Sequence, residues 1–582
     1  MTKRWRIATH DPQRVSDLGR AAGIPAVVAQ LLLCRGISHP DTARDFLAAP
    51  LAKLRQPMEL PGVEAAAVRL WEAVREGKRI VIYGDYDVDG VSGSSILLEA
   101  LRLLKANVTY HIPHRFTDGY GLNRRALKSL AEEGAQMVVT VDCGITAVDE
   151  ARLARELGVD LIITDHHEMG EELPDALLVH PRLPGSSYPF AGLSGSGVAF
   201  KLAWALGVVA AGGTGRTSGE MREFLCRAMV LASLGTVADV VPLVDENRIL
   251  VRHAVQHLRD WSTLGLRTLL DVMGGNKSQY GSEDIGFGIA PRLNAAGRLG
   301  QARLAVELLT TRCPNRALEL AQYIDQLNVS RRSLEQSVYL AALKQAQEQF
   351  DPEHDPALVL AGRGWHGGII GIVAGRLAEK FHRPVILLAL SDLGDRPASG
   401  SCRSVPGFNV HEALQACSHR LKKFGGHAAA AGLSLDEDQI DHFRGDFCEY
   451  VAERITPEER IAELAIDVEA PLSAFTLKTV SQMDQLAPFG AGTARPLLCT
   501  TGVRLASPPR KMGGGDRHLS LHLEQHGVKL RSVAFGGGEW ADELEKCQGA
   551  DLAVAFRPKV NVFKGKANVE LELADWKLAS EL

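Results

Sequence analysis

The sequence has few aromatic residues, no surplus of positive charge and no paired cysteines. Aromatic residues make up 6% of the chain and the formal net charge is −5. A uniformly basic surface is therefore excluded, and any site for a polyanion has to be a local patch on a mildly acidic body. The nine cysteines form no Cys-x-x-Cys pair and show no zinc-ligand spacing. This usage is typical of free thiols in a reducing cytoplasm.

Long hydrophobic segments are also missing. The first residues, MTKRWRIATHDP, contain no apolar region of the kind that a signal peptide needs. The most apolar long run covers residues 197–212, but it is short and carries Lys201. We therefore predict a buried helix there, no association with a membrane, and a cytoplasmic location.

The length of the chain predicts several domains. A chain of 582 residues is too long for one hydrophobic core, and three or four domains are expected. Hydrophobic residues make up 46% and charged residues 23% of the sequence, as in an ordinary soluble globular protein.

An acidic segment, residues 81–95 (VIYGDYDVDGVSGSS), is the most informative part of the sequence. The apolar run before Gly84 is typical of a buried strand, and Asp85, Asp87 and Asp89 follow at alternate positions. Residues two apart in an extended chain point the same way, so these carboxylates repel one another unless a cation lies between them. A solvated acidic turn, with Asp89 as a partial N-cap of a helix, explains the segment equally well.

Strand and helix patterns alternate from about residue 62 to residue 250. Because the strands are continuously apolar, the pattern predicts an α/β domain built on a doubly wound parallel sheet. The expected strands cover residues 79–83, 108–112, 137–141 and 160–164, and the expected helices cover residues 64–76, 92–104, 124–133, 147–157 and 224–234.

Folds of this kind place their sites outside the carboxyl ends of the strands. Polar residues follow the predicted strands and the helix at 224–234, and they could converge on one rim: Asp87, Asp89, Asp142, His166, His167 and Asp239. Taken alone, each residue is more often a turn residue, a surface or satisfied core histidine, or a helix end. Together, carboxylates with one or two imidazoles favour Mn²⁺ or Mg²⁺, bound singly or as a pair.

Four motifs in order resemble those of the DHH phosphoesterase superfamily: GDYDVDG, TVDCG, Asp165-His166-His167 and GTVADVVPL. More narrowly, YGDYDVDG, YHIPHRFTDGYGL, LNAAGRL and GGHAAAAG together are similar to the RecJ family of bacterial exonucleases specific for single-stranded DNA. The similarity extends from about residue 60 to beyond residue 500.

The resemblance implies a site for two metal ions, Mn²⁺ or Mg²⁺. Matching positions assign ligands at Asp87, Asp89, Asp142, His166 and Asp239, with Asp142 as the bridging ligand at the catalytic centre. Asp85 completes the first site where other members of the superfamily use a histidine. His167 is expected beside the scissile phosphate as a catalytic residue rather than as a main ligand.

The resemblance also implies substrate-binding residues. Arg115 is a candidate anchor for a terminal 5′-phosphate, since a guanidinium suits a phosphate dianion, and Ser401 and Arg403 share that role. Further candidates are Gly425, Gly426, His427, Arg292, Asn294 and Arg298. The simpler alternatives are polar residues on an ordinary loop, solvent-exposed arginines on a capped helix, and glycines that only allow close packing. Cys402 departs from the smaller residue expected at that position.

The remaining sequence completes a predicted division into five segments. These are an N-terminal helical segment (1–61), the DHH domain (62–300), a helical connector (301–352) with one long helix at 315–349, a second α/β domain of the DHHA1 type (353–457) and a C-terminal OB-fold β-barrel (458–582). Glycine-rich residues 367–376 begin a helix that could receive a phosphate. The barrel carries Arg557, Lys559, Phe563, Lys564 and Lys566, which form either a solvated hairpin or a surface that tracks single-stranded DNA.

These expectations define one function and two competitors. The resemblance implies a metal-dependent exonuclease that removes 5′-mononucleotides from the 5′ end of single-stranded DNA in repair and recombination. The first competitor is a phosphodiesterase for short oligonucleotides or cyclic dinucleotides, and the second is a non-catalytic DNA-binding scaffold. Expected partners are single-stranded DNA, a single-strand-binding protein and a RecQ-type helicase; nothing in the sequence demands a dimer, so a monomer is expected.

Overall fold

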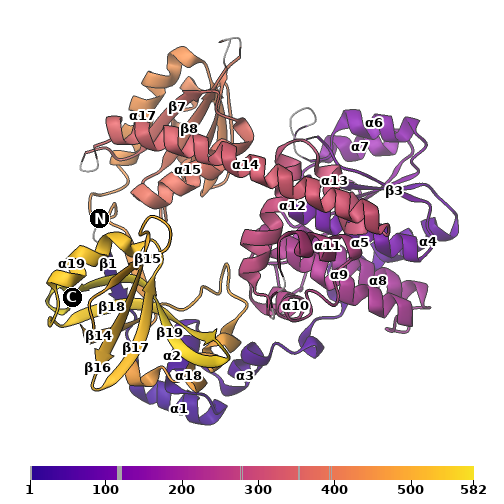
Figure 1. The fold of residues 1–582 in the computed structure, drawn as a ribbon. Helices are drawn as coiled ribbons and strands as arrows, with labels where there is room; N and C mark the ends of the chain where they lie inside the picture. Colours follow the sequence, from indigo (N-terminus) through magenta and orange to yellow (C-terminus); the bar gives the residue numbers. More distant parts are fainter. Residues whose placement is uncertain are drawn as a thin grey trace.

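The computed structural model describes residues 3–114, 119, 121–275, 277, 279–351, 354–391, 394 and 396–582. Figure 1 shows two α/β units joined by the long helix α14, and a β-rich unit that contains both ends of the chain. Each unit has its own sheet. The predicted fold class, α/β with a C-terminal β-barrel, is confirmed.

The first α/β unit contains a five-stranded, fully parallel sheet in the order β3-β2-β4-β5-β6. Successive residues of a strand point to opposite faces of the sheet. Both faces are therefore apolar, and helices cover both of them, as predicted. Ile80 and Ile82 of β2 belong to one core, and Val81 and Tyr83 to the other. The strands are β2 (Ile80–Gly84), β3 (Val108–His111), β4 (Met137–Val141), β5 (Asp160–Thr164) and β6 (Leu177–Val179), of which β6 was not predicted.

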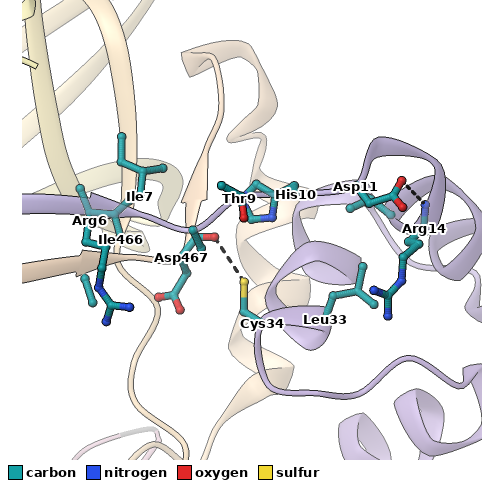
Figure 2. Close-up of a pocket in the computed structure, with 13 residues that line it drawn as sticks. Arg6, Ile7, Thr9, His10, Asp11, Arg14, Leu33, Cys34, Ile466 and Asp467 are labelled. Atoms are coloured by element: carbon teal, nitrogen blue, oxygen red, sulfur yellow. Dashed lines mark hydrogen bonds between the residues drawn. The ribbon is translucent and has the colours of Figure 1, made fainter.

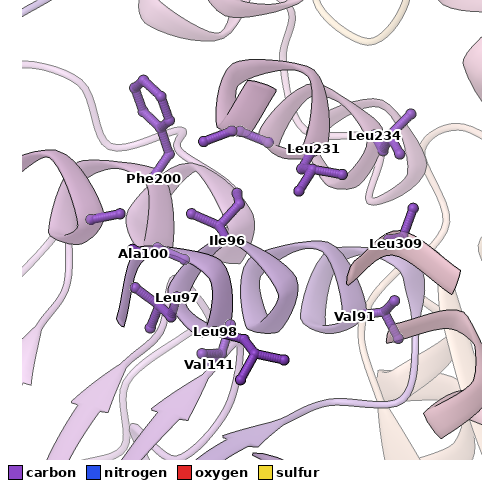
Figure 3. Close-up of a cluster of buried hydrophobic side chains, with 14 of the residues drawn as sticks. Val91, Ile96, Leu97, Leu98, Ala100, Val141, Phe200, Leu231, Leu234 and Leu309 are labelled. Carbon is purple, nitrogen blue, oxygen red and sulfur yellow. The ribbon is translucent and has the colours of Figure 1, made fainter. Parts of the chain in front are cut away.

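Helix α5 (Val88–Leu103) lies at the centre of the larger core (Figure 3), where its residue Val91 is close to Leu309. It begins four residues before the predicted start because Asp87 caps it. Around it pack α8 (Gly195–Ala210) and α9 (Gly219–Ala238). The other helices are α4 (Val63–Arg75), α6 (Arg124–Glu132), α7 (Val148–Glu156), α10 (Asp245–Gln256), α11 (Leu264–Val272), the π-helical η3 (Asp284–Ile289), α12 (Ala290–Arg298) and α13 (Ala302–Thr310).

Helix α14 (Pro314–Gln349) is a single helix of 36 residues, as predicted. Ala321 and Ile324 in its first half are buried in the core of the first unit. Val338 and Ala342 in its second half are buried against the second unit. The helix therefore belongs to both α/β units and fixes the spacing between them.

The second α/β unit has a mixed sheet in the order β10-β11-β9-β8-β7. Only β7 and β8 are parallel; the other neighbours are antiparallel. The strands are β7 (Leu358–Arg363), β8 (Val385–Leu390), β9 (Ala398–Arg403), β10 (Lys423–Gly426) and β11 (Ala430–Leu435), and the helices are α15 (Gly367–Phe381), α16 (Val410–Ala416) and α17 (Ile440–Ala452).

The C-terminal unit contains the predicted barrel. Strands β14, β18, β19, β17 and β16 are neighbours in that order, and a further pairing of β14 with β16 closes the ring. Five strands closed in this way are typical of an OB fold. The strands of the unit are β13 (Val468–Glu469), β14 (Leu498–Leu505), β15 (Arg510–Met512), β16 (His518–Gln525), β17 (Val528–Ala534), β18 (Leu552–Phe563) and β19 (Lys566–Leu578), with helices α18 (Leu477–Met483) and α19 (Ala541–Lys546).

The N-terminal segment packs against this barrel. Strand β1 (Arg4–Ile7), which was not predicted, pairs in parallel with β12 (Glu463–Ile466). Helices α1 (Pro12–Ala22), α2 (Ala26–Cys34) and α3 (Pro40–Ala48) share one hydrophobic core with the barrel. A cavity of about 510 Å³ lies where β1, α1, α2 and β12 meet, and the Cys34 thiol there donates to the carbonyl oxygen of Asp467 (Figure 2).

The apolar helix α8 is a core helix that contains a buried charge. Lys201 and Glu246 are both 0% exposed and form an ion pair. The Lys201 ammonium also donates to the carbonyl oxygen of Arg55, and Glu246 accepts from Tyr188 and from the backbone N–H of Arg55. Within the described residues no single helix is long and apolar enough to cross a membrane. The bent pair α1 and α2 together passes the same test, but by length and composition alone.

Replacing Lys201 with methionine is expected to lower the free energy of unfolding by about 3 to 5 kcal/mol, because the buried Glu246 loses its directly paired cation and keeps only the more distant Arg55 guanidinium, at 3.6 Å. Equilibrium urea unfolding followed by circular dichroism measures this change. The matched control is Lys344→Met, which removes an exposed partner of Glu348 and should change stability by less than about 0.5 kcal/mol. Equal effects of the two substitutions would contradict the assigned role of the buried pair.

Candidate metal centre

Acidic residues and histidines from four elements converge at the carboxyl end of the parallel sheet. In the strand order β3-β2-β4-β5, the chain passes from β2 to β3 on one side and from β4 to β5 on the other, which makes the boundary between β2 and β4 the switch point where such folds bind ligands. Three overlapping groups bring their ligand atoms within 4.8 Å of one another: Asp85, Asp87 and Asp142; Asp142, His166 and His167; and Asp89, His166 and Asp239. Asp142 and His166 each belong to two groups.

Helix N-termini hold two of these carboxylates. Asp87 is the N-cap of α5 and accepts hydrogen bonds from the backbone N–H groups of Asp89 and Gly90, at 2.9 and 3.0 Å. Asp89 accepts from the N–H groups of Gly195 and Ser196, at 2.6 and 2.9 Å, at the start of α8. Backbone N–H groups at a helix start stabilise negative charge. The N-cap is thus Asp87 and not Asp89.

Two glycines allow the helices to approach these carboxylates. A Cβ atom on Gly235 of α9 would lie 2.1 Å from Oδ1 of Asp89, and a Cβ on Gly195 would lie 2.4 Å from Oδ1 of Asp142. No larger residue fits without moving an acidic side chain or a helix. The glycines therefore determine how closely the carboxylates can be gathered.

Asp142 lies between the groups in a constrained backbone conformation. Its φ angle is 65°, a left-handed value that aspartate adopts more readily than most residues, and its N–H donates to the carbonyl oxygen of Thr164 at 3.0 Å. Burial, and then the charges of Asp89 and Asp87, raise the pKa of Asp142 well above its usual range. Burial and the same two neighbours raise the pKa of Asp239 to about 8.

The mutual repulsion of these carboxylates indicates whether a metal ion fits among them. Carboxylates whose pKa values are raised by burial and by one another are stabilised by a cation between them. The donors are carboxylate oxygens with one or two imidazoles, a set that suits Mn²⁺ or Mg²⁺. The residues present therefore fit divalent cations.

His166 joins the second and third groups. Its Nε2 atom lies 3.1 Å from Oδ1 of Asp142, 3.5 Å from Oδ2 of Asp239 and 3.8 Å from Oδ2 of Asp89. Burial is the largest influence on its pKa and lowers it. The neutral imidazole is the form that binds a metal ion.

His167 is held differently from His166. Its Nδ1 atom lies 2.7 Å from Oδ1 of Asp165, which is buried and also accepts from the N–H of Ile145 at 2.9 Å. Burial lowers the pKa of His167, but the hydrogen bond to Asp165 and nearby carboxylates outweigh it and raise the pKa to about 9. The hydrogen bond to Asp165 and these carboxylates therefore favour the protonated form of His167. The sequence analysis did not include Asp165 in the site, although it begins the Asp-His-His run.

Ser401 and Arg403 lie together on β9, beside the glycine-rich start of α15. The Arg403 guanidinium donates to the Ser401 hydroxyl at 3.0 Å, and a Cβ on Gly371 would lie within 3 Å of both side chains. The second unit contacts the first at the same place, since Arg298 of α12 donates to the carbonyl oxygen of Gly368 at 3.0 Å. A Cβ on Gly297 would lie 2.4 Å from the carbonyl oxygen of Tyr86. The predicted 5′-end anchor is thus joined to the acidic loop through α12.

The hairpin tip at Gly425, Gly426 and His427 is exposed. The pKa of Glu168 is lowered mainly by its hydrogen bond to Arg182 and, to a smaller extent, by His427. The tip therefore lies near the segment that follows His167.

The other predicted substrate residues have different surroundings. Arg292 is tied to Asp325 of α14 at 2.7 Å and to the carbonyl oxygen of Gly288. Asn294 and Arg298 line a cavity of about 400 Å³. Arg115 lies outside the described residues.

The sequence analysis missed two exposed apolar side chains in this cavity. Val240, directly after Asp239, is 68% exposed and has a φ angle of 60°, which is rare for a β-branched residue. Phe287 is 77% exposed and lies in the π-helix η3, a feature frequent at functional sites. No signal in the sequence distinguishes either residue from a core residue.

Replacing Gly235 with alanine is expected to weaken Mn²⁺ binding by about 10- to 100-fold, because the new methyl group displaces Asp89, a change of the kind seen when the support of a metal ligand is lost. Isothermal titration calorimetry measures the affinity. The matched control is Gly445→Ala in α17, where a Cβ meets nothing within 4 Å and stability should rise slightly. Unaltered affinity in Gly235→Ala would mean that the close approach is not needed.

Comparisons with known proteins match all three units. Models of the DHH family N-terminal domain, the DHHA1 domain and the RecJ OB domain match residues 79–232, 354–453 and 466–575. The single-stranded-DNA-specific exonuclease RecJ of Bacillus subtilis is 38% identical over 573 residues, which cover 98% of this chain and 70% of the relative. RecJ of Escherichia coli is 33% identical over 591 residues, 98% of this chain and 99% of the relative.

Solved structures give the same result. The crystal structure of RecJ in complex with Mn²⁺ from Thermus thermophilus has a TM-score of 0.81 at 32% identity, and the match covers 99% of this chain and 79% of that one. The corresponding complex with Mg²⁺ has a TM-score of 0.76 at 30% identity, with 99% and 78% covered. This chain belongs to the RecJ family of DHH/DHHA1 proteins.

Proposed function

We propose that this protein is a metal-dependent exonuclease that degrades single-stranded DNA from the 5′ end and releases 5′-mononucleotides during repair and recombination. The observation that carries the proposal is the set of three donor groups at the switch point of the sheet. Asp142 links the first group to the second, and His166 links the second to the third. The similarity to exonucleases named as specific for single-stranded DNA supports the substrate.

Divalent cations, Mn²⁺ or Mg²⁺, would be held by Asp85, Asp87 and Asp142 on one side and by Asp89, His166 and Asp239 on the other. Such ions lower the pKa of a water molecule and offset the charge of a phosphodiester. Asp142 has the position of a shared ligand because it belongs to the first group and its Oδ1 atom also lies 3.1 Å from Nε2 of His166 in the other. The crystal structures of similar proteins with Mn²⁺ and Mg²⁺ support both choices of ion.

His167 supplies a proton donor at the same site. Asp165 fixes the orientation of its ring, and the ring lies beside the Asp142–His166 centre, with Nδ1 3.9 Å from Oδ1 of Asp142. An imidazolium in this place can donate a hydrogen bond to the phosphate or to the 3′-oxygen that leaves. Its role is thus electrostatic stabilisation and proton transfer.

Polarity would depend on the anchor for the terminal phosphate. Ser401, Arg403 and the N–H groups at the start of α15 offer a hydroxyl, a guanidinium and a helix N-terminus to one phosphate. Arg115 belongs to the same proposed anchor. Because this group lies next to α12 and the acidic loop, a strand held there presents a bond near its 5′ end to the metal ligands.

The two competing functions are less well supported. A phosphodiesterase for dinucleotides does not need the barrel, whose Lys559 lies 5.2 Å from the ring of Phe535. A scaffold does not need a complete ligand set, yet every proposed ligand position holds a competent residue. Removing residues beyond about 455 would not discriminate, because β1 and α1–α3 would lose the partners with which they fold.

The same proposal includes a cytoplasmic location, a monomeric state, and a single-strand-binding protein and a RecQ-type helicase as partners. These partners fit a nuclease that needs exposed single strands. The free cysteines support the location.

Replacing Asp142 with asparagine is expected to reduce the rate of hydrolysis by on the order of 10³-fold or more, about 4 kcal/mol of transition-state stabilisation, because the shared ligand loses its charge. The assay follows a single-stranded oligonucleotide labelled at either end, with Mn²⁺ or with EDTA. Early release of a labelled mononucleotide from the 5′ end, abolished by EDTA, is the expected pattern. Early release from the 3′ end would overturn the polarity, and no hydrolysis by the unaltered protein would favour the scaffold.

Replacing Arg403 with alanine is expected to lower kcat/KM for 5′-phosphorylated strands by about 10- to 100-fold, which corresponds to the loss of ionic hydrogen bonds worth about 1.5 to 3 kcal/mol. Strands with a 5′-hydroxyl end should be affected much less. Arg376→Ala is the matched control, since Arg376 lies on the neighbouring helix α15 and pairs with Glu335. An equal loss on both kinds of strand would remove Arg403 from the anchor.

A further inference from the structure

The segment at residues 486–493 (LAPFGAGT) joins the C-terminal unit to the first α/β unit. It follows helix α18 and precedes strand β14, and it contains none of the proposed metal or substrate residues. The backbone carbonyl groups of residues 486–488 accept hydrogen bonds from Arg248, and that of Phe489 accepts one from the Ser282 hydroxyl at 2.5 Å. The first half of the segment is therefore held by side chains of the first unit.

The second half of this segment holds the loop that follows the metal ligand Asp239. The N–H of Leu243 donates to the carbonyl oxygen of Ala491 at 2.8 Å, and the Thr493 hydroxyl donates to the carbonyl oxygen of Leu243 at 3.1 Å. Gly490 and Thr493 are bonded to each other through their backbones, which gives the segment a fixed turn. Leu243 and Thr493 are each 1% exposed, so water does not compete for these bonds.

The turn and the loop fit closely. A Cβ atom on Gly490 would lie 2.7 Å from Cδ1 of Leu243, and a Cβ on Gly492, whose φ angle is 68°, would lie 3.1 Å from Cβ of Pro242. Asn247 of α10, which is buried, donates to the carbonyl oxygen of Pro242 at 3.0 Å. The loop is thus held by both units.

Asp239 depends on this support more than the neighbouring ligands do. Asp87 and Asp89 accept hydrogen bonds from backbone N–H groups. No described residue donates a hydrogen bond to the Asp239 carboxylate, which lies 3.5 Å from Nε2 of His166. Directly after it, at the end of α9, Val240 has a φ angle of 60°, and a β-branched residue keeps this conformation only where its surroundings impose it.

We infer that Thr493, with the turn at residues 490–493, is a positioning residue for the metal ligand Asp239. By fixing Leu243, it imposes the path of the chain through Val240 and so keeps the Asp239 carboxylate beside the other ligands of its group. The inference rests on the proposed function. It adds a second task for the C-terminal unit, the support of a metal ligand that belongs to the first unit.

Thr493→Val tests the inference, because valine keeps the shape of threonine but leaves the buried carbonyl group of Leu243 without its donor. Isothermal titration calorimetry with Mn²⁺, in the absence of DNA, should show an affinity about tenfold lower at one site, the smallest loss typical of removing the support of a metal ligand. The site that contains Asp85 and Asp87 should keep its affinity. Thr493→Ser, which retains the hydroxyl, should bind both ions as the unaltered protein does.

The matched control is Thr500→Val. Thr500 lies on β14 of the same unit, is also 1% exposed, and donates its hydroxyl to the carbonyl oxygen of Ala470 at 2.6 Å. The control therefore loses the same kind of hydrogen bond, but no contact with the first unit. We expect a comparable decrease of Tm in both variants and weaker Mn²⁺ binding in Thr493→Val alone. Equal Mn²⁺ affinities in the two variants, or an equal loss at both metal sites of Thr493→Val, would contradict the inference.

Hydrolysis of single-stranded DNA separates this inference from the proposed function. If the unaltered protein shows no hydrolysis with Mn²⁺, the proposed function fails, and the Mn²⁺ affinities alone decide the inference. If it is active, Thr493→Val should lower kcat at limiting Mn²⁺ and leave KM for the strand unaltered, because Thr493 is too deeply buried to contact DNA. A higher Mn²⁺ concentration should restore the rate. A raised KM with an unaltered kcat would instead assign Thr493 to DNA binding and remove it from the metal centre.

Hydrogen exchange in the unaltered protein avoids any defect in the folding of a variant. Coupling between two sites is reciprocal, so a turn that supports the metal site must itself be stabilised by Mn²⁺. Exchange of the Leu243 amide should therefore slow when Mn²⁺ binds. The Ala506 amide, which donates to the carbonyl oxygen of His522 within the barrel, should exchange at the same rate with and without Mn²⁺. An unchanged rate at Leu243 under saturating Mn²⁺ would refute the link between the turn and Asp239.

Discussion

Mutual repulsion among buried carboxylates at one edge of a parallel sheet is the constraint on which the structure depends. The helices nearest this edge are arranged to reduce that repulsion. Helix α8 directs its first N–H groups at Asp89, and α5 is capped by Asp87. The small residues Gly195 of α8 and Gly235 of α9 let these two helices come near enough. These contacts leave part of the negative charge uncompensated, above all at Asp142 and Asp239. A divalent cation neutralises that remaining charge.

The units around this edge are joined by contacts to backbone carbonyl groups. Arg298 reaches from α12 to α15, and Arg248 of α10 donates to the carbonyl oxygens of residues 485–488 while it packs on the ring of Phe46 at 3.8 Å. Arg248 is 2% exposed because the two units enclose it, and this burial lowers its pKa to about 9. Since a guanidinium bound to several carbonyl groups has little freedom, the barrel is held firmly against the first unit.

Much of the fold and of the metal centre could be predicted from the sequence, because both depend on local patterns. The apolar runs predicted both ends of β4 and of β5 correctly. The acidic residues after these runs lie where the carboxyl ends of parallel strands meet. Other features depend on contacts between distant segments and leave no local pattern. The partner of β1 is β12, more than 450 residues away, and nothing in the run RWRI indicates a strand. Likewise, the sequence around Phe287 is typical of a core residue, whereas in the structure this side chain lies on the π-helix and is exposed.

The pairing of β1 with β12 has a consequence for the order in which the protein folds during synthesis. Arg4 and Glu463 are neighbours across this ladder although 459 residues separate them. At a typical rate of synthesis, the partner strand emerges from the ribosome about 20 to 90 s after β1 does. Throughout that interval the apolar faces of α1, α2 and α3 have no barrel to cover them. The beginning of the chain is therefore among the last parts to reach its native contacts, and its exposed segments are natural clients for chaperones.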